Sequence, residues 1–429
     1  MRVKGSFAKV KKFVVAAPFQ QTLSVLDGGN RRSKRLACMK VIGLFAALAI
    51  STQLAAQRES EQHLQDMKTP LTLVGAILVP GSPLHFDISW VDQKSERYFL
   101  AEAGNAGVDV FDAENDLFLG RIPGFHGLAA PTDPCGRIDG MGPSGVVMAS
   151  DNKLWVTDAH GTVKVFDLSN AQPPFNVAPI ATIPTGAQCR SDELAFDPKD
   201  HLVIVGNPAE APPFATLISS DPPYKVVGEI QFPGAGGLEQ SLWDDEWNGG
   251  RFLVDVPGAG NSGMIAVVNP QTKAVETTYP TPGCAGAGLA LAPFQQLLVA
   301  CGNGQPLLIL NALNGSVINT ITQIAGADEV WYNRGDGRFY AASNTAPTPV
   351  VGVIDAESGT FLQTVPSGPG AHSVAAFRES NHIFVPIGVP TPTIPTDTCA
   401  VMFGFPANTG CIGVYTHENE NGEDTQDHN

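Results

Sequence analysis

The chain has 429 residues, of which 43% are hydrophobic and 16% charged, with 45 glycines and 34 prolines. This composition is rich in turns yet apolar enough to build a core, which excludes a wholly disordered protein. Residues 1–56 carry ten Lys/Arg and one acid, which leaves 16 Lys/Arg against 41 Asp/Glu in residues 57–429. A body of that charge repels phosphate backbones, so we expect no nucleic-acid partner.

Residues 1–56 have the pattern of a leader that ends in a signal peptide. Met39-Lys40 precedes the apolar run Val41–Ile50, and small residues follow up to Ala56, after which we place the cleavage site. Either Met39 is the true start, or Arg31-Arg32 belongs to a twin-arginine signal. The apolar run is too short to span a bilayer. The pattern predicts a secreted or periplasmic protein with no membrane span. A linker (57–69) joins the leader to the folded part.

A unit of four short strands recurs seven times between residues 70 and 416. Its third strand is apolar and closes on a polar residue, and a turn joins it to the fourth strand. Four-stranded units at this spacing predict an all-β fold, a seven-bladed β-propeller. The third strands end in 110–112, 165–167, 217–219, 267–269, 309–311, 353–355 and 414–416.

The two ends of the repeat region complement each other. The seventh unit stops in its third strand, and a hydrophobic strand at Leu71–Val79 stands before the first unit. We expect this N-terminal strand to complete the last blade, which closes the ring and hides both sheet edges. A proline-rich loop, Gly388–Thr398, interrupts the last blade and is a candidate lid for the channel. Residues 417–429 are predicted to form an acidic disordered tail.

Six of the seven cysteines follow the leader, and Cys38 lies within it. An even number after a signal peptide, with no CxxC spacing, favours disulfides in an oxidising compartment over structural zinc. Six cysteines allow fifteen connectivities. Their placement in the predicted ring favours Cys135–Cys189, Cys284–Cys301 and Cys399–Cys411, and the alternative is that one or more stay free and buried.

The turn sequences Val353–Gly359 and Ile309–Gly315, with the first-strand phrases Asp192–Pro198 and Asp328–Asn333, resemble those of the seven-bladed YVTN/lactonase-like propeller superfamily. The resemblance covers about 70–416. In the lactonase-like branch, a metal held by channel carboxylates and amides polarises an ester carbonyl. The superfamily also contains lyases, redox-cofactor enzymes and non-catalytic binders, so the resemblance implies the fold more strongly than the function.

In a propeller, the segment before each inner strand points toward one mouth of the central channel. In six of the seven blades this segment carries ionisable groups, and in blade five it reads Ala285-Gly-Ala287. The ionisable mouth residues are His85 and Asp87, Arg137 and Asp139, Arg190, Asp192 and Glu193, Glu239, Asp328 and Glu329, and His372.

Convergent carboxylates repel one another unless they share a cation or a proton. We therefore predict that a divalent metal such as calcium binds the oxygen ligands of Asp87, Asp192, Glu193, Asp328 and Glu329. His85 and His372 are the candidate catalytic acid and base. Arg137, Arg190 and Glu239 are the candidate substrate-binding residues, since a guanidinium suits an anionic group.

Structural roles for the same residues stay open. The acids could bond backbone N–H groups at the blade ends, and the two arginines could pair with Asp139 and Asp192. His126 and His160 lie in loops on the side of the mouth, either at its rim or as surface turn residues. Residues predicted to lie simply on the surface are His201, His382 and His417.

The sequence favours a monomeric, secreted propeller with a small-molecule site at the channel mouth, where a metal assists hydrolysis of a lactone or ester. One alternative is a non-catalytic propeller that binds a protein partner or an envelope polymer. A further alternative is a lyase or redox-cofactor propeller.

Overall fold

The computed structural model describes residues 69–81, 84–247, 249–345 and 348–417. The predicted leader (1–56), almost all of the linker (57–69) and almost all of the acidic tail (417–429) lie outside the described residues. No helix within the described ranges is long and apolar enough to cross a membrane.

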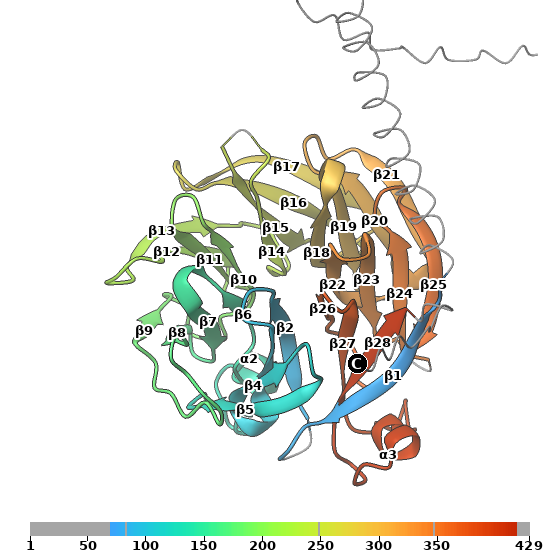
Figure 1. Ribbon diagram of the computed structural model, residues 1–429. Helices are drawn as coiled ribbons and strands as arrows, with labels where there is room; N and C mark the ends of the chain where they lie inside the picture. The colour runs from blue at the N-terminus through green and yellow to red at the C-terminus, as the bar shows by residue number, and fades with distance from the viewer. Residues whose placement is uncertain (1–68, 82–83, 248, 346–347, 418–429) are drawn as a thin grey trace, which may run out of the picture. The chain divides into compact units, whose positions relative to one another are not determined.

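Seven four-stranded antiparallel sheets stand side by side in a ring (Figure 1), which confirms the predicted seven-bladed β-propeller. All seven predicted third strands are confirmed. In each blade the first three strands pair in sequence order, from the inner strand outward. Because neighbouring strands run in opposite directions, the loop before each inner strand and the hairpin between its second and third strands lie on one face, here called the upper face.

The blades have the following strands. Blade 1 is β2 (Phe86–Asp92), β3 (Arg97–Glu102), β4 (Gly107–Asp112) and β5 (Leu117–Pro123); blade 2 is β6 (Val146–Met148), β7 (Lys153–Asp158), β8 (Thr162–Asp167) and β9 (Ala181–Pro184); blade 3 is β10 (Leu194–Asp197), β11 (Leu202–Asn207), β12 (Phe214–Ser219) and β13 (Val226–Gln231); blade 4 is β14 (Ser241–Asp244), β15 (Arg251–Pro257), β16 (Ser262–Asn269) and β17 (Ala274–Pro282). Blade 5 is β18 (Gly286–Ala292), β19 (Gln296–Cys301), β20 (Pro306–Asn311) and β21 (Val317–Ala325); blade 6 is β22 (Ala327–Asn333), β23 (Arg338–Ser343), β24 (Val350–Asp355) and β25 (Thr360–Pro366); blade 7 is β26 (Ala375–Phe377), β27 (His382–Ile387), β28 (Cys411–His417) and β1 (Leu71–Leu78). Short helical segments are η1 (Ala103–Asn105), α2 (Gly136–Asp139), η2 (Ser150–Asn152), η3 (Pro293–Gln295) and α3 (Thr398–Phe403).

The ring closes as predicted, through the N-terminal strand. β1 is the outer strand of blade 7 and pairs antiparallel with β28, from Leu71 opposite His417 to Leu78 opposite Cys411. One register shift, between Leu73 and Gly75, interrupts this ladder. The ends of the folded part therefore share one sheet.

Local sequence explains the hairpins between the third and fourth strands. In blade 6 the Asp355 carboxylate accepts the backbone N–H of Ser358 at 2.8 Å, and Gly359 has a φ of 65°. In blade 5 the Asn311 side chain accepts the N–H of Leu313 at 3.0 Å, and Gly315 has a φ of 71°. Asp or Asn satisfies the turn's first donors and glycine supplies the left-handed residue, so both turns are specified by residue type.

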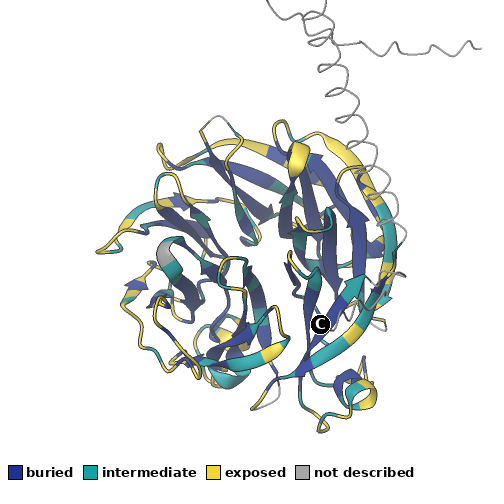
Figure 2. Cartoon of the chain, in the orientation of Figure 1, coloured by how far each residue is buried: buried dark blue, intermediate teal, exposed yellow. Residues whose placement is uncertain are grey.

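The hydrophobic core lies between neighbouring blades rather than at one centre. Phe99 and Val110 of blade 1 pack with Leu154 and Phe166 of blade 2 in one buried cluster. Figure 2 shows that the inner strands are largely buried and the outer strands partly exposed. Each blade is therefore held mainly by its two neighbours, and the closed ring supplies every blade with both.

Three disulfides join the predicted pairs. Cys135–Cys189 links the loops that lead into blades 2 and 3, Cys284–Cys301 lies in blade 5, and Cys399–Cys411 lies in blade 7. The insertion that follows β27 was predicted as a candidate lid for the channel. Its helix α3 instead lies beside β1 at the outside of the ring (Figure 1). Its buried Cys399 packs against Ile387 and Cys411 of blade 7, which draws the insertion outward.

One of the histidines predicted at the surface belongs to the fold. His417 is the last residue of β28, its Nδ1 bonds the Thr69 carbonyl at 2.9 Å, and its Nε2 lies 2.7 Å from the Tyr340 hydroxyl. Burial, with the neighbouring Arg338 guanidinium, lowers the pKa of His417 to about 4. His201 is exposed as predicted, and His382 is partly buried 3.0 Å from Asp116.

Candidate functional site at the channel mouth

The upper-face ends of the inner strands bring the predicted ionisable residues together. Asp87 is on β2, and Asp328 and Glu329 are on β22. The others precede β10, β14 and β26 or lie on α2. These inner strands neighbour one another around the ring axis. We call the group Asp87, Asp139, Arg190, Asp192, Glu193, Glu239, Asp328, Glu329 and His372 the mouth cluster.

Arg190 lies at the centre of the mouth cluster and contacts three carboxylates from three blades. Its guanidinium is 2.8 Å from Asp192, 3.2 Å from Asp87 and 3.3 Å from Asp139. The predicted pairing of Arg190 with Asp192 is present, whereas Asp139, predicted to pair with Arg137, pairs with Arg190 instead. A guanidinium held in this way acts as a counterion for the cluster, which leaves few of its donors for a substrate anion.

Arg137 has a different environment. It lies exposed on α2 and contributes to the low pKa of His85. Partial desolvation of the His85 imidazole is the larger cause of that lowering, and the Asp87 carboxylate opposes it. His85 itself is exposed at the rim, and its backbone N–H donates to Glu102 at 2.8 Å.

The innermost pair of acids shares a hydrogen bond. Glu193 and Glu329 are 4% and 6% exposed, and their side chains bond each other. Burial and the neighbouring acids raise the pKa of both well above the usual range. Two carboxyl groups can bond each other only when at least one keeps its proton, so the close approach of this pair favours a shared proton.

Burial also raises the pKa of three further acids of the cluster, Asp192, Glu239 and Asp328. Burial raises the pKa of Asp192 to about 7, although Arg190 opposes the shift. Burial, together with Asp192 and Asp328, raises the pKa of Glu239 well above normal. The pKa of Asp328 is raised by burial and by Asp87, while His372 and Arg190 lower it. At neutral pH the cluster therefore carries protons that a bound cation could replace.

His372 faces the cluster in a fixed orientation. Its Nδ1 lies 2.6 Å from the Gly370 carbonyl, which can only accept, so Nδ1 carries a proton. The ring stacks on Phe86 at 4.7 Å, and Nε2 points toward Asp87 at 4.0 Å. Nε2 is thus the atom free to accept or return a proton, as expected of a candidate acid–base group.

Sequence analysis missed one buried acid behind the cluster. Asp255 of β15 is fully buried, and its burial raises its pKa well above normal. Blade five, which offers no polar mouth residue, makes the space for it: a Cβ on Gly286 would lie 1.9 Å from the Asp255 carboxylate. The available signal was an acid in the otherwise apolar run Phe252–Val256.

An open cavity of about 530 Å³ adjoins the mouth cluster on blade 3. Asp139, Arg190 and Glu239 form its inner wall, and two loops rich in proline and glycine form its sides. Its lining residues are Asp139, Arg190, Pro208 to Pro213, Gly234 to Gly237 and Glu239. A small molecule in this cavity would meet the cluster at one end.

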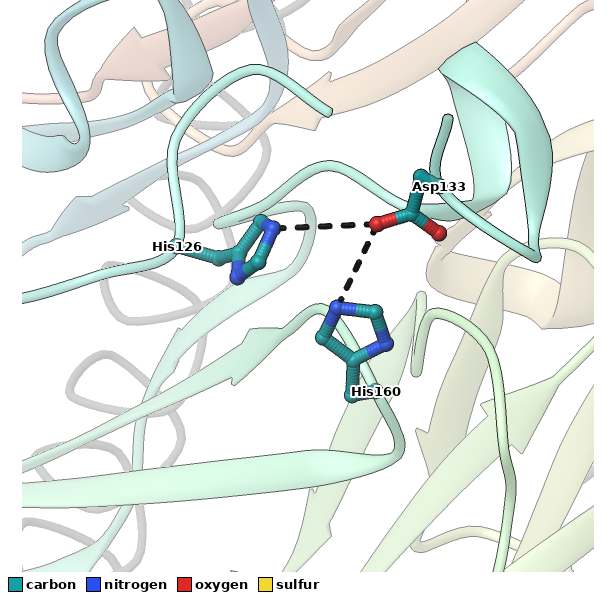
Figure 3. A group of neighbouring side chains, drawn as sticks. All are labelled: His126, Asp133 and His160. Carbon is teal, nitrogen blue, oxygen red and sulfur yellow. Dashed lines mark ion pairs between the residues drawn. The ribbon is translucent and has the colours of Figure 1, made fainter. Parts of the chain in front are cut away.

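The carboxylates predicted as metal ligands are neighbours. A different group of side chains, however, brings its potential ligand atoms closer together. Within the described ranges, three ligand atoms of His, Cys, Asp or Glu lie within 4.8 Å of one another at His126, Asp133 and His160 (Figure 3). At the mouth, the guanidinium of Arg190 lies among the acids and contacts three of them. Metal binding there stays a prediction that requires these acids to lose protons and close on the ion.

Comparison with known proteins supports the fold. No protein-family model matches the chain, and no curated protein matches it. Among solved structures, a chain from the structure described as "Crystal Structure of Mitotic Checkpoint Complex" superposes with a TM-score of 0.59. The match covers 82% of this chain and 94% of that chain at 13% identity, so it shows the propeller fold alone.

Proposed function

We propose that the protein is a secreted propeller whose channel mouth binds a small molecule together with a divalent cation, and that it hydrolyses a lactone or ester there. The observation that carries the proposal is the excess of acid over base in the mouth cluster. The mouth cluster holds seven carboxyl groups and one guanidinium, that of Arg190, and burial raises the pKa of five of the seven. The three disulfides are consistent with an oxidising compartment.

Carboxylate oxygens are the ligands that calcium prefers, so the donor set suits a hard cation. Asp87, Asp192, Glu193, Asp328 and Glu329 would hold the ion through their carboxylate oxygens. A bound divalent ion polarises a carbonyl oxygen. His372 Nε2 would take the proton of the attacking water, with Nδ1 fixed by the Gly370 carbonyl. The turn sequences that resemble lactonase-like propellers favour this reaction.

Elemental analysis and calcium titration test the proposal. We expect one equivalent of calcium or another hard divalent ion, with release of protons on binding at pH 6.5 because the acids must ionise. Asp328→Asn with Glu329→Gln should abolish this binding and leave the fold intact by circular dichroism. Asp221→Asn, in an exposed turn on blade 3, is the matched control.

A chelated protein that binds no calcium and releases no protons would contradict the cation-dependent site. If calcium binds, a screen of lactones and esters follows, and hydrolysis by the wild type that is lost in His372→Gln would support the reaction. Calcium binding without any turnover would support a binding function for the same site.

A second candidate function, non-catalytic binding of a protein partner, is favoured by the surface of α3. Val401 and Met402 are 73% and 58% exposed on this short helix, which the Cys399–Cys411 disulfide ties to blade 7. Large apolar side chains exposed together are frequent in protein interfaces. If this helix binds a partner, an immobilised Val401→Ser/Met402→Ser variant should fail to retain an envelope protein that the wild type retains.

A further inference from the structure

His126, Asp133 and His160 form a second cluster on the upper face, made of residues that do not belong to the mouth cluster. His126 follows β5 in the loop between blades 1 and 2, and His160 sits at the tip of the β7–β8 hairpin. Asp133 lies in the loop before α2. Figure 3 shows the two imidazoles directed at the same carboxylate. Three segments of the chain thus present ligand atoms to one point.

The distances suit a metal ion better than direct hydrogen bonds. His160 Nε2 is 3.5 Å and His126 Nε2 is 4.0 Å from the same oxygen, Oδ2 of Asp133. Hydrogen bonds from nitrogen to oxygen are about 2.7–3.2 Å, so both contacts are too long. Ligands about 2.0–2.1 Å from a tetrahedral ion are about 3.3–3.4 Å apart, which the His160 pair already matches and the His126 pair approaches.

Outer contacts hold the Asp133 carboxylate in place. Asp133 Oδ1 accepts the Cys135 N–H at 2.9 Å, which leaves Oδ2 for the imidazoles. Cys135 is fixed in turn by its disulfide to Cys189. Gly140 makes room for the carboxylate, because a Cβ there would lie 2.6 Å from Asp133 Cγ. Such outer-shell support is characteristic of metal sites.

One buried carboxylate positions both histidine-bearing segments. Asp158 Oδ1 accepts the backbone N–H of His126 at 3.1 Å and that of Ala159, next to His160, at 2.9 Å. Its other oxygen is bound by Lys164 at 2.6 Å. The two imidazoles meet edge to face with their centroids 4.6 Å apart, so neither blocks the other's approach to Asp133. The spacing of the ligands is therefore set by the backbone.

We propose that His126, Asp133 and His160 bind one divalent transition-metal ion, with zinc the best match. Two imidazoles and one carboxylate are a zinc donor set, whereas a hard ion such as calcium prefers oxygen ligands alone. Both histidines are exposed, so the fourth position of the ion faces solvent. A three-ligand site with an open position can bind water or a donor atom of a ligand. This rim site is independent of the calcium site proposed at the mouth.

Zinc titration of the chelated mature protein, in competition with a chromophoric zinc indicator, tests the proposal. We expect one zinc ion per chain. His160→Asn and His126→Gln should each weaken binding at least 100-fold; asparagine tolerates the positive φ of 54° at position 160, so the hairpin is kept. His201→Asn, which removes an exposed histidine paired with Asp221 and keeps a residue that tolerates the positive φ of 54° there, is the matched control and should bind zinc as the wild type does.

A second measurement guards against loss of fold. Each variant should melt at the wild-type temperature in chelator, and cobalt in the wild type should give the intense visible bands of a tetrahedral site, absent in Asp133→Asn. The proposal is overturned if the wild type takes up no zinc, or if His160→Asn binds zinc as tightly as the wild type. It is also overturned if Glu193→Gln at the mouth abolishes zinc binding, since the ion would then lie at the other site.

Discussion

Arg190 shows how a single residue can decide the charge of a whole site. Three carboxylates from three blades contact its guanidinium, and the acids beyond its reach keep protons instead. The convergence of these residues was predictable from their positions before the inner strands. Two features were not predictable from the sequence: the contact of Arg190 with three carboxylates, and the hydrogen bond between Glu193 and Glu329. Both depend on which side chains from different blades meet.

Replacing Arg190 should be strongly destabilising. Arg190→Met leaves Asp87, Asp139 and Asp192 without their shared counterion, and removing one partner of a buried ion pair costs about 3–5 kcal/mol. Urea unfolding measures the loss. Arg378→Met is the matched control, because its pair with Glu379 is exposed and such pairs contribute about 0–1 kcal/mol. Equal effects of the two substitutions would contradict a buried, shared counterion.

The raised pKa values of the buried carboxyl groups predict how the free energy of unfolding depends on pH when no metal is bound. A carboxyl whose pKa is higher in the folded state binds more protons there, so the free energy of unfolding falls as pH rises above the unfolded value. For Glu193 the fall begins near pH 4.5. Glu193→Gln keeps a donor for Glu329 and should lessen the loss between pH 5 and pH 8 by at least about 1.4 kcal/mol, the free energy that corresponds to one pKa unit. Chemical denaturation in chelator measures it, and an unchanged slope would refute the assignment.

Elements of the ring are tied to one another at the upper face by residues at the ends of the second strands. Glu102 accepts the N–H of His85, Asp158 accepts that of His126, and Asn207 accepts the hydroxyl of Ser191 at 2.9 Å. In blade 5 the Cys284–Cys301 disulfide takes this place. The predicted role of bonding backbone N–H groups thus falls to strand ends such as Glu102 and Asp158, whereas burial and neighbouring acids dominate the pKa shifts of Glu193 and Glu239.

The inner strand β18 should tolerate no side chain at its first residue. Gly286→Ala brings a Cβ against the Asp255 carboxylate, and overpacking of this kind costs about 1–3 kcal/mol. Asp255→Ala removes the clash, so the double variant should regain most of the loss. A double-mutant cycle by thermal unfolding measures the coupling, and additive effects would show that the two residues do not meet.

The recurring four-stranded unit made the strands and turns of the blades predictable from the sequence. The third strands and their turns carry local signals, such as Asp355 and Gly359, that depend on few distant contacts. The position of α3 could not be read in this way, because it follows from the packing of Cys399 against blade 7. His417 was missed for a similar reason, since its partners Tyr340 and Thr69 come from distant parts of the chain.

The whole molecule depends on β1 to have no open sheet edge in blade 7. A chain that begins at residue 80 would lack this strand and expose the edge of β28 along Cys411–His417. An unpaired, flat edge invites pairing with another chain, so we expect self-association and a lower melting temperature. Light scattering after size exclusion measures this. A chain that begins at residue 69, and so keeps β1, should stay monomeric; association of both chains alike would contradict the role of β1.

The pairing of β1 with β28 also imposes an order on folding. Thr72 and Thr416, which face each other in this ladder, are 344 residues apart in the chain. β1 is synthesised before the other strands of the ring but can pair only after β28, the last one. The other six blades can each form from neighbouring segments as these are synthesised. Contacts this distant are slow to form, because the loop entropy must be lost first. Completion of blade 7 is thus the step at which a nascent chain becomes committed to its closed form, and until then the apolar strand β1 is available to chaperones.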